Sequence, residues 1–243
     1  MNAHFLLKYF EWVAEAPDAV KNLRKFILEL AIRGKLVKQN QADEPASKLL
    51  KRIEAEKNGR FKKRQSSRPH DEDETPFVLP IGWGWTELAE IGIINPKNEV
   101  DDTIKSSFVP MPMIFSEYGK KNLHEVRAWA EIKKGFTHFA EGDVGLAKIT
   151  PCFENGKSTV FTNLTGGIGA GTTELHIVRP ILVVPDYILI FLKSRHFIET
   201  GIPKMTGTAG QKRVPRDYFS FSPFPLPPLA GECPRPPQRA SCQ

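Results

Sequence analysis

The sequence is short of the features that mark secreted, membrane-spanning and metal-binding proteins. It has three cysteines, Cys152, Cys233 and Cys242, which form neither a disulfide framework nor a metal-ligand spacing. Their scarcity favours a reducing, cytoplasmic compartment. No apolar run approaches the ~20 residues of a membrane-spanning helix. The N-terminus is polar and lacks a small-residue cleavage site, so we expect neither a membrane span nor a signal peptide.

The sequence also lacks the motifs of common catalytic sites. Residues 156–158 (GKS) resemble the end of a phosphate-binding P-loop, but Pro151 stands where that motif needs its first glycine. The glycines of 167–171 precede β-branched residues instead of a helix, which argues against a dinucleotide-binding fingerprint and predicts a turn. The six histidines show no zinc spacing, and no Asn-Pro-Pro-Tyr-like tetrapeptide of an adenine methyltransferase is found. We therefore predict a protein that binds rather than catalyses.

What the chain does have is a globular composition with a modest excess of positive charge. Hydrophobic residues make up 40% of its 243 residues and charged residues 26%, which suits one good domain and a smaller one. The formal net charge is +6. This excess suits an anionic partner such as nucleic acid, although many proteins that bind none are as basic.

The first part of the chain has helical periodicity. Helices are predicted over residues 5–13, from about Asp18 to Arg33 with Gly34 as the stop, and from near Pro45 onward. The apolar stripes of the second and third helices comprise Val20, Leu23, Ile27, Leu30, Leu49, Leu50 and Ile53. These stripes favour helices that fold onto one another, and docking of a partner is the alternative. A basic run at 57–68 and an acidic run at 71–74 then predict a solvated, mobile linker.

Beyond Pro76 the pattern changes to short strands. Residues 132–139 and 143–149 are predicted to form a hairpin through Glu141 and Gly142. Residues 185–197 predict a helix. Residues 219–229 predict a strand that continues as extended, proline-rich chain.

The stretch 143–180 organises this second part of the chain. It predicts a strand, a polar loop, a strand, a glycine turn and a strand. The polar loop carries lysines, hydroxyls and an asparagine, which a hydrophobic core does not need. Lysine supplies charge to phosphates, and asparagine can pair with adenine. A second polar loop at 206–213 carries glutamine and arginine, which pair with adenine and guanine. Ordinary polar surface loops are the alternative for both.

Several motifs resemble one known family. AKITPCFENGK, GTTELHIVRP, MTGTAGQKRVPRDYF and PFPLPPLA resemble the target-recognition domain of type I restriction-modification specificity subunits. LRKFILELAIRGKLV, DEPASKLLKRIEAEK and LPIGWGW resemble that family's conserved helical region and the entry into its recognition domain. The resemblance runs in the same order from about Phe5 to Ala230. The family usually carries two recognition domains and two helical regions, whereas this chain has one of each.

The resemblance implies an α+β protein. A helical, coiled-coil-like segment and charged linker would occupy residues 1–75 and a mixed α/β target-recognition domain residues 76–229. The chain would be the non-catalytic specificity subunit, or half of one, that binds a half-site in double-stranded DNA and positions methyltransferase and restriction subunits there. No cofactor is expected in this chain. The partner methyltransferase would use S-adenosylmethionine, and the partner nuclease ATP and Mg²⁺.

The candidate site residues are chosen by chemistry and position, because the family's base-reading residues vary between members. The DNA-binding candidates are Lys148, Thr150, Asn155, Lys157, Thr172, Thr173, Gln211, Lys212 and Arg213. The partner-binding candidates are Leu23, Ile27, Leu30, Leu49 and Ile53.

Two other functions compete with this one. The first is a remnant that docks its partners without specific DNA binding, and the second is a stand-alone DNA enzyme, which the missing motifs disfavour. The tail at 230–243 has three prolines and no apolar periodicity, so we expect disorder where the family leads one to expect a helix. A frameshift or truncation is the simplest interpretation, and a head-to-tail homodimer would then cover the exposed stripe.

Overall fold

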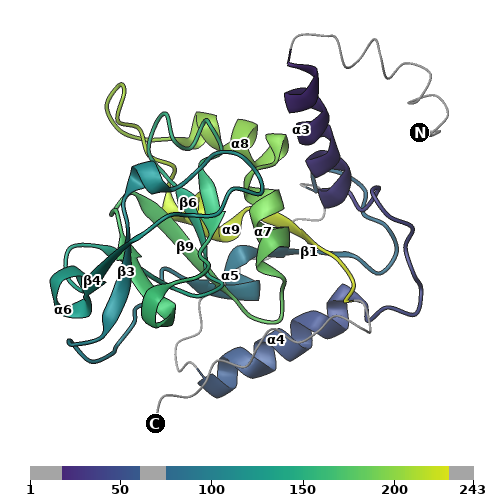
Figure 1. The fold of residues 1–243 in the computed structure, drawn as a ribbon. Helices are drawn as coiled ribbons and strands as arrows, with labels where there is room; N and C mark the ends of the chain where they lie inside the picture. The colour runs from purple at the N-terminus through teal and green to yellow at the C-terminus, as the bar shows by residue number, and fades with distance from the viewer. Residues whose placement is uncertain (1–17, 61–74, 230–243) are drawn as a thin grey trace.

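The computed structural model describes residues 18–60 and 75–229, and its fold is α+β, as predicted (Figure 1). Two helices come first, followed by two four-stranded sheets, a two-stranded pair and short helices placed against them. The helix predicted at 5–13, most of the predicted linker and the tail at 230–243 lie outside the described residues. The division of the chain into domains stays a prediction.

The first helices begin and end where the sequence has clear signals. α3 spans Ala19–Ile32 and is followed by Gly34 at φ 63°. α4 spans Ala46–Arg60. Lys57 therefore belongs to α4 and not to the predicted linker. Its ammonium donates to the carbonyls of Glu90 and Gly92, at 3.3 and 3.2 Å, and burial lowers its pKa.

The later helices depart from the predicted ones at their ends. The helix predicted at 185–197 is two helices, α7 (Pro185–Leu192) and α8 (Arg195–Gly201). They are separate because the Ser194 hydroxyl caps α8 by accepting a hydrogen bond from the Phe197 backbone N–H. α9 (Arg216–Phe221) occupies the start of the strand predicted at 219–229. The remaining helical turns are α5 (Leu88–Ile91), α6 (Trp129–Ile132), η2 (Met111–Met113), η3 (Thr165–Gly167) and η4 (Ile202–Lys204).

The strands are short and form three sheets. In chain order they are β1 (Gly84–Glu87), β2 (Gly92–Ile94), β3 (Lys105–Val109), β4 (Glu125–Ala128), β5 (Thr137–Ala140), β6 (Val144–Ala147), β7 (Ser158–Val160), β8 (Ile168–Gly171), β9 (Leu175–Pro180) and β10 (Pro223–Leu226). One sheet has the order β2-β9-β6-β7 and the other β4-β3-β8-β5, while β1 pairs with β10. All pairs are antiparallel except β3 with β8.

The predicted hairpin through Glu141 and Gly142 is wrong. β5 pairs with β8, whereas β6 pairs with β7 and β9, so this turn leads from one sheet to the other. The reason lies in Asp143, which is fully buried. Its carboxylate accepts a hydrogen bond from the Ala140 backbone N–H at 2.7 Å and another from Arg179 of β9. These bonds direct β6 toward β9 and away from β5.

The glycines at 167–171 do more than form a turn. Gly167 ends η3 in a left-handed conformation, but Gly169 and Gly171 belong to β8, between β3 and β5. A Cβ on Gly169 would lie 2.5 Å from the Phe139 ring and 2.5 Å from the Ser107 carbonyl oxygen. Glycine is therefore required here by close approach of a ring and a backbone, which sequence spacing does not reveal.

Aromatic stacking joins the two four-stranded sheets. The rings of Phe139 in β5 and Phe161 after β7 stack at 3.7 Å with an interplanar angle of 3°. A larger cluster on the other side of the β6 sheet joins α7, α8 and α9 with Ile32 of α3 and Leu49 and Ile53 of α4. The helical segment thus shares a core with the sheets.

Gly169→Ala should destabilise the protein by about 1–3 kcal/mol, since the added methyl group overpacks a site that is already filled. The measurement is urea unfolding followed by circular dichroism. Gly59→Ala is the control, because a Cβ at that position in α4 meets nothing within 4 Å. Equal stability of the two variants would contradict the packing described for β8.

Candidate nucleic-acid interface

Three segments that are distant in the sequence meet at one edge of the β6 sheet. The backbone N–H of Lys148, just after β6, donates to Glu174 O at 2.9 Å. The backbone N–H of Thr150 donates to Lys212 O at 2.9 Å. Val214 N–H in turn donates to Lys148 O at 2.8 Å. The structure therefore brings the predicted loops at 148–157, 172–174 and 211–213 onto one surface.

The segment 206–213 is a hairpin with an exposed tip. Thr206 and Arg213 exchange two backbone hydrogen bonds of 3.0 and 2.8 Å. Gly207 and Gly210 have positive φ values of 124° and 77°, which favour glycine and allow the chain to reverse. All residues from Thr206 to Lys212 are exposed. In Figure 1 this hairpin is the yellow-green loop that projects at the upper left, beyond α8.

Glu174 fixes the base of this hairpin. Its carboxylate accepts two hydrogen bonds from the Arg213 guanidinium, at 2.9 Å to Nε and 2.8 Å to Nη2. The hydrogen bond from Arg213 holds the pKa of Glu174 below its usual range. Arg213 is thus committed to a side chain of its own protein, whereas Gln211, at the end of the turn, and the following Lys212 are exposed. Sequence spacing gave no signal for this pair, whose members are 39 residues apart.

The loop at 150–157 is a compact turn with Asn155 on its outside. Asn155 N–H donates to Pro151 O at 3.1 Å, and Gly156 N–H donates to Phe153 O at 2.8 Å. Phe153 is fully buried and packs against Phe197 of α8. The Lys157 ammonium donates to the Met111 carbonyl at 3.2 Å. Asn155 is therefore presented outward, whereas Lys157 joins the loop to the rest of the protein.

The threonines of the predicted set have different environments. The Thr150 hydroxyl is buried and has no hydrogen-bond partner among the described residues. The Thr172 hydroxyl accepts a hydrogen bond from the Glu174 backbone N–H at 3.2 Å, and Thr173 is exposed. Taken together, the exposed members of the predicted set are Asn155, Thr173, Gln211 and Lys212.

The buried side chain of His176 contacts the backbone next to this surface. It lies in β9, is 5% exposed, and its Nε2 contacts Val214 O at 3.0 Å. Its ring stacks on Phe219 of α9. Burial lowers the pKa of His176 to about 4, and the charges of Lys148 and Arg216 act in the same direction while Glu174 opposes them. The imidazole is therefore neutral at physiological pH.

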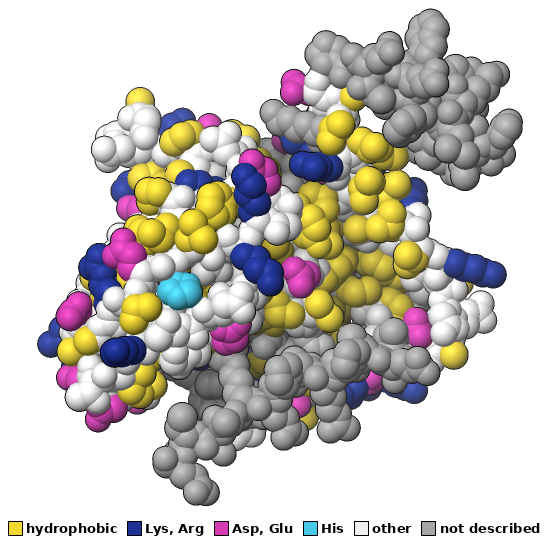
Figure 2. Space-filling view, in the orientation of Figure 1, with side chains coloured by type: hydrophobic (Ala, Val, Ile, Leu, Met, Phe, Trp, Pro, Cys, Tyr) yellow, Lys and Arg dark blue, Asp and Glu magenta, His cyan; other side chains and the backbone are white. Residues whose placement is uncertain are grey.

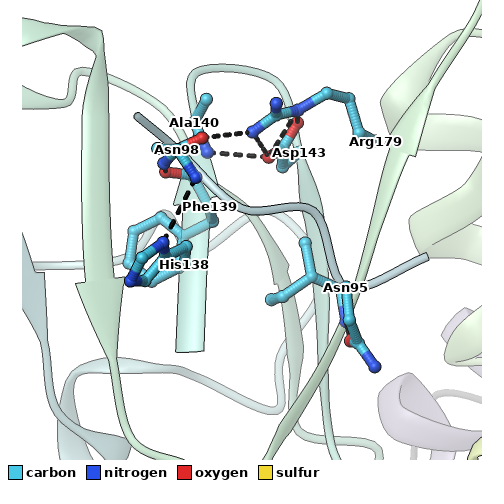
Figure 3. A network of polar contacts seen from close by, with 8 residues as sticks. Asn95, Asn98, His138, Phe139, Ala140, Asp143 and Arg179 are labelled. Carbon is cyan, nitrogen blue, oxygen red and sulfur yellow. Dashed lines mark hydrogen bonds and ion pairs between the residues drawn. The ribbon is translucent and has the colours of Figure 1, made fainter. Parts of the chain in front are cut away.

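A polar network at the ends of β6 and β9 that lie away from the site holds β9 and the β5–β6 turn together (Figure 3). The guanidinium of Arg179 donates to both oxygens of Asp143 at 2.8–3.1 Å, and also to the Asn98 side-chain oxygen at 2.8 Å. Asn98 Nδ2 donates to Phe139 O at 2.7 Å, and Asn98 N–H donates to His138 Nδ1 at 3.2 Å. The network places β9, and with it Glu174, relative to the second sheet.

The partner-binding candidates fall into two groups. Leu49 and Ile53 are buried against the core of this same chain and are not available to a partner. Ile27 of α3 is 41% exposed, and Leu23 and Leu30 are half-buried. α3 lies against α7 and α8, and α4 lies against α5. The exposed side of α3 is therefore the part of this set that a partner can reach.

Figure 2 shows hydrophobic side chains gathered over the lower part of α3 and the surface between α3 and α4. The large hydrophobic side chains exposed along this part of the described chain are Val20, Phe26, Ile27, Leu36, Val37, Val78 and Ile81. Contiguous exposed apolar surface is typical of a site for another protein.

Within residues 18–60 and 75–229, no group of three or more His, Cys, Asp or Glu side chains is placed to hold a metal ion. In the same part of the chain, no helix is long and apolar enough to cross a membrane.

The described residues form an α+β fold in which three polar loops converge on one surface. No protein-family model matches the chain. Over 217 residues it is 54% identical to the type I restriction enzyme EcoEI specificity subunit of Escherichia coli, a match that covers 86% of this chain and 36% of that protein. It is 51% identical over 218 residues to the EcoAI specificity subunit of the same organism, which covers 86% of this chain and 37% of that protein.

A solved structure shares the fold. The crystal structure of the HsdS subunit from Thermoanaerobacter tengcongensis superposes with a TM-score of 0.50 at 23% identity, over 64% of this chain and 40% of that chain. The chain spans a little over a third of the length of the curated relatives that it matches. Over the matched residues, the chain is similar to type I restriction enzyme specificity subunits, which confirms the resemblance. Both relatives are named for specificity, in agreement with the prediction of a chain that binds rather than catalyses.

The burial of neutral His176 predicts a stability that depends on pH. As pH falls, the unfolded chain takes up a proton at about 6.5 and the folded chain only at about 4. The contribution to stability is therefore full above pH 6.5 and is lost as pH falls from 6.5 to 4, by about 3 kcal/mol at most. Urea unfolding at several pH values measures it. His176→Gln should flatten this part of the profile, and an unchanged profile would contradict the assignment.

Proposed function

We propose that this chain binds a half-site in double-stranded DNA as the sequence-reading part of a type I specificity subunit. The observation that carries the proposal is the convergence of the 148–157, 172–174 and 206–213 segments on one surface. The similarity to two specificity subunits supports the same function. The surface would grip the duplex while partner subunits carry out the chemistry.

The hairpin at 206–213 has a shape that suits the major groove. That groove is about 12 Å wide and admits a two-stranded ribbon. Gln211, exposed at the end of the turn, carries an amide that can pair with the N6 and N7 positions of adenine, and Asn155 on the neighbouring loop carries the same group. Lys212 and Lys148 would contact phosphates and set the register of the hairpin on the duplex.

The Glu174–Arg213 pair makes this surface compatible with DNA. A lone carboxylate in the centre of the surface would repel phosphates. Arg213 neutralises it with two hydrogen bonds, and the charge of Lys148 lies close enough to lower the pKa of Glu174 further. In the proposal Arg213 shapes the hairpin, and Gln211 reads the base.

The remaining partners would hold the catalytic chemistry. A methyltransferase subunit would use S-adenosylmethionine, and a restriction subunit would use ATP and Mg²⁺. Methylation of a base requires that the base leave the helical stack, so the subunit that reads the sequence must hold the flanking duplex. The proposal places this chain in the cytoplasm, where its DNA partner lies.

The exposed side of α3 is the proposed site for the methyltransferase subunit. It carries the exposed apolar side chains of Val20, Phe26 and Ile27, and it is separate from the 206–213 hairpin. A head-to-tail homodimer through the same side of α3 is the competing arrangement, and light scattering of the purified chain distinguishes it from a monomer.

A docking module without specific DNA binding is the second candidate function, and the same apolar side of α3 favours it. Selection from a pool of random duplexes separates the two functions. The full chain, alone and with its methyltransferase subunit, is incubated with the pool, and the bound DNA is sequenced. Enrichment of one short site supports the proposal. Capture of the methyltransferase subunit with no enriched site would leave only the docking function.

Two neighbouring substitutions test the assignment of roles in the hairpin. Gln211→Ala should cost about 1–3 kcal/mol on the selected site and much less on random DNA, because a base contact is lost. Lys212→Ala should weaken binding to both DNAs alike and lower the slope of log K against log salt by about 0.9, because a phosphate contact is lost. Each variant is the control for the other, and the reverse pattern would exchange their roles.

Ile27→Lys should abolish co-purification of the methyltransferase subunit, because it places a charge in the centre of an apolar contact. Its thermal unfolding should shift little, since Ile27 is 41% exposed in the chain itself. Val126→Lys, at a 56% exposed position on β4, is the matched control and should retain the partner. Retention by both variants would exclude this side of α3 as the docking site.

A further inference from the structure

Residues 114–122 form a loop with a fixed base and an exposed tip. The Leu123 backbone N–H donates to Met113 O at 3.1 Å, which closes the loop. Ile114 is fully buried, and Asn122 is 6% exposed with its side-chain oxygen accepting from Thr162 N–H at 3.2 Å. Every residue from 116 to 121 is exposed. Surface loops on a rigid base are common carriers of binding function.

Lys193 joins this loop to the candidate DNA-binding loop at 150–157. It lies at the end of α7, and its ammonium donates to Ser116 O at 2.8 Å, Gly156 O at 3.0 Å and Phe115 O at 3.4 Å. An ammonium has three donors, and these three carbonyls accept all of them. Both loops therefore turn their backbones toward the same buried nitrogen and lie next to each other.

A second lysine makes the same connection. Lys157 of the candidate loop donates to the Met111 carbonyl, two residues before the closure at Met113. Burial lowers the pKa of Lys193 to about 8, and Glu117 opposes this shift, so the group is mostly charged at neutral pH. Lys193 thus holds the 114–122 loop against the 150–157 loop, and Lys157 joins the 150–157 loop to the segment just before residue 114.

The tip of the loop carries two adjacent exposed lysines. Lys120 pairs with Glu117 at 3.2 Å, and their side chains are 58% and 52% exposed. An exposed pair of this kind contributes little and is screened by salt, so a phosphate can compete with the carboxylate. Lys121 and Tyr118 are exposed beside it. The tip therefore offers charge and a hydroxyl donor to an anionic polymer lying across both loops.

We propose that the 114–122 loop is a further DNA-contacting segment, in which Lys120 and Lys121 bind phosphates and Lys193 is the residue that positions the loop. The inference rests on the proposed function, because it extends the same DNA-binding surface. DNA fits this tip because Lys193 joins the loop to the neighbouring loop at 150–157, where Asn155 is exposed. An acidic surface on a partner protein is the competing occupant.

The test uses the full chain and a duplex of about 30 base pairs of random sequence, titrated between about 50 and 200 mM salt. The double variant Lys120→Ala with Lys121→Ala should lower the log–log salt slope by about 2, because two phosphate contacts are lost. Glu117→Gln should tighten binding, since it frees Lys120 and removes a negative charge. The matched control is Lys48→Ala with Lys51→Ala, two exposed lysines on α4, and it should retain the parent slope.

The outcomes separate this inference from the proposed function. If the parent chain binds no duplex with any salt dependence, the proposed function itself fails. If the parent binds and the Lys120/Lys121 variant keeps the parent slope, only the inference is overturned. If this variant no longer binds the methyltransferase subunit and its salt slope on DNA is unchanged, the two lysines contact the partner protein. That result would also overturn the inference.

The role of Lys193 is tested separately with Lys193→Met. The variant should be cut faster by trypsin at Lys120 and Lys121, because the loop loses its attachment, and should lose part of the salt slope on DNA. Circular dichroism establishes that it is folded. If the variant does not fold, the Lys120/Lys121 and Glu117 variants decide the matter. A folded variant with the parent's rate of cleavage and slope would refute positioning by Lys193.

Discussion

The arrangement of this protein depends on one buried ion pair, between Asp143 and Arg179. Asp143 is fully buried, so its charge needs compensation, and Arg179 supplies it with three hydrogen bonds of 2.8–3.1 Å. Removing one partner of such a pair typically costs about 3–5 kcal/mol, because an uncompensated charge is left in the interior. The pair therefore fixes where β6 can lie relative to β9.

The register of β6 and β9 connects this ion pair to the candidate interface. The pair holds the end of β9 beside the start of β6, and at the opposite ends of these strands Ala147 pairs with Leu175. Lys148 and Glu174 are the residues next to this pair in the chain, and their backbones are joined by a hydrogen bond. Glu174 then holds Arg213 and the base of the 206–213 hairpin. A buried centre thus supports the exposed loops of the candidate interface.

The sequence predicted the elements that local chemistry decides. α3 ends before Gly34, α4 starts after Pro45, and the apolar runs around Leu146 and Ile177 are buried strands. The sequence also indicated polar loops as the candidate site, and these loops lie close together in the structure. It did not predict that β5 and β6 belong to different sheets, because that outcome depends on a buried bond between residues 36 apart.

The sequence also did not predict the roles of individual site residues. Arg213 looked like a base-reading side chain, but its guanidinium is held by Glu174, and Lys157 contacts a carbonyl of its own chain. Leu49 and Ile53 have the spacing of a docking stripe and are instead buried in the core. In each case the residue type and spacing were correct for the predicted role, and a long-range contact determined the actual environment.

The similarity to two specificity subunits covers 86% of this chain. Amide hydrogen exchange of the full chain, with its methyltransferase subunit and with or without a selected duplex, tests the central claim most directly. The account predicts that DNA slows exchange in residues 148–157, 172–174 and 206–213 and leaves α4 unchanged. Slower exchange confined to α3, or none in the three loops, would contradict it.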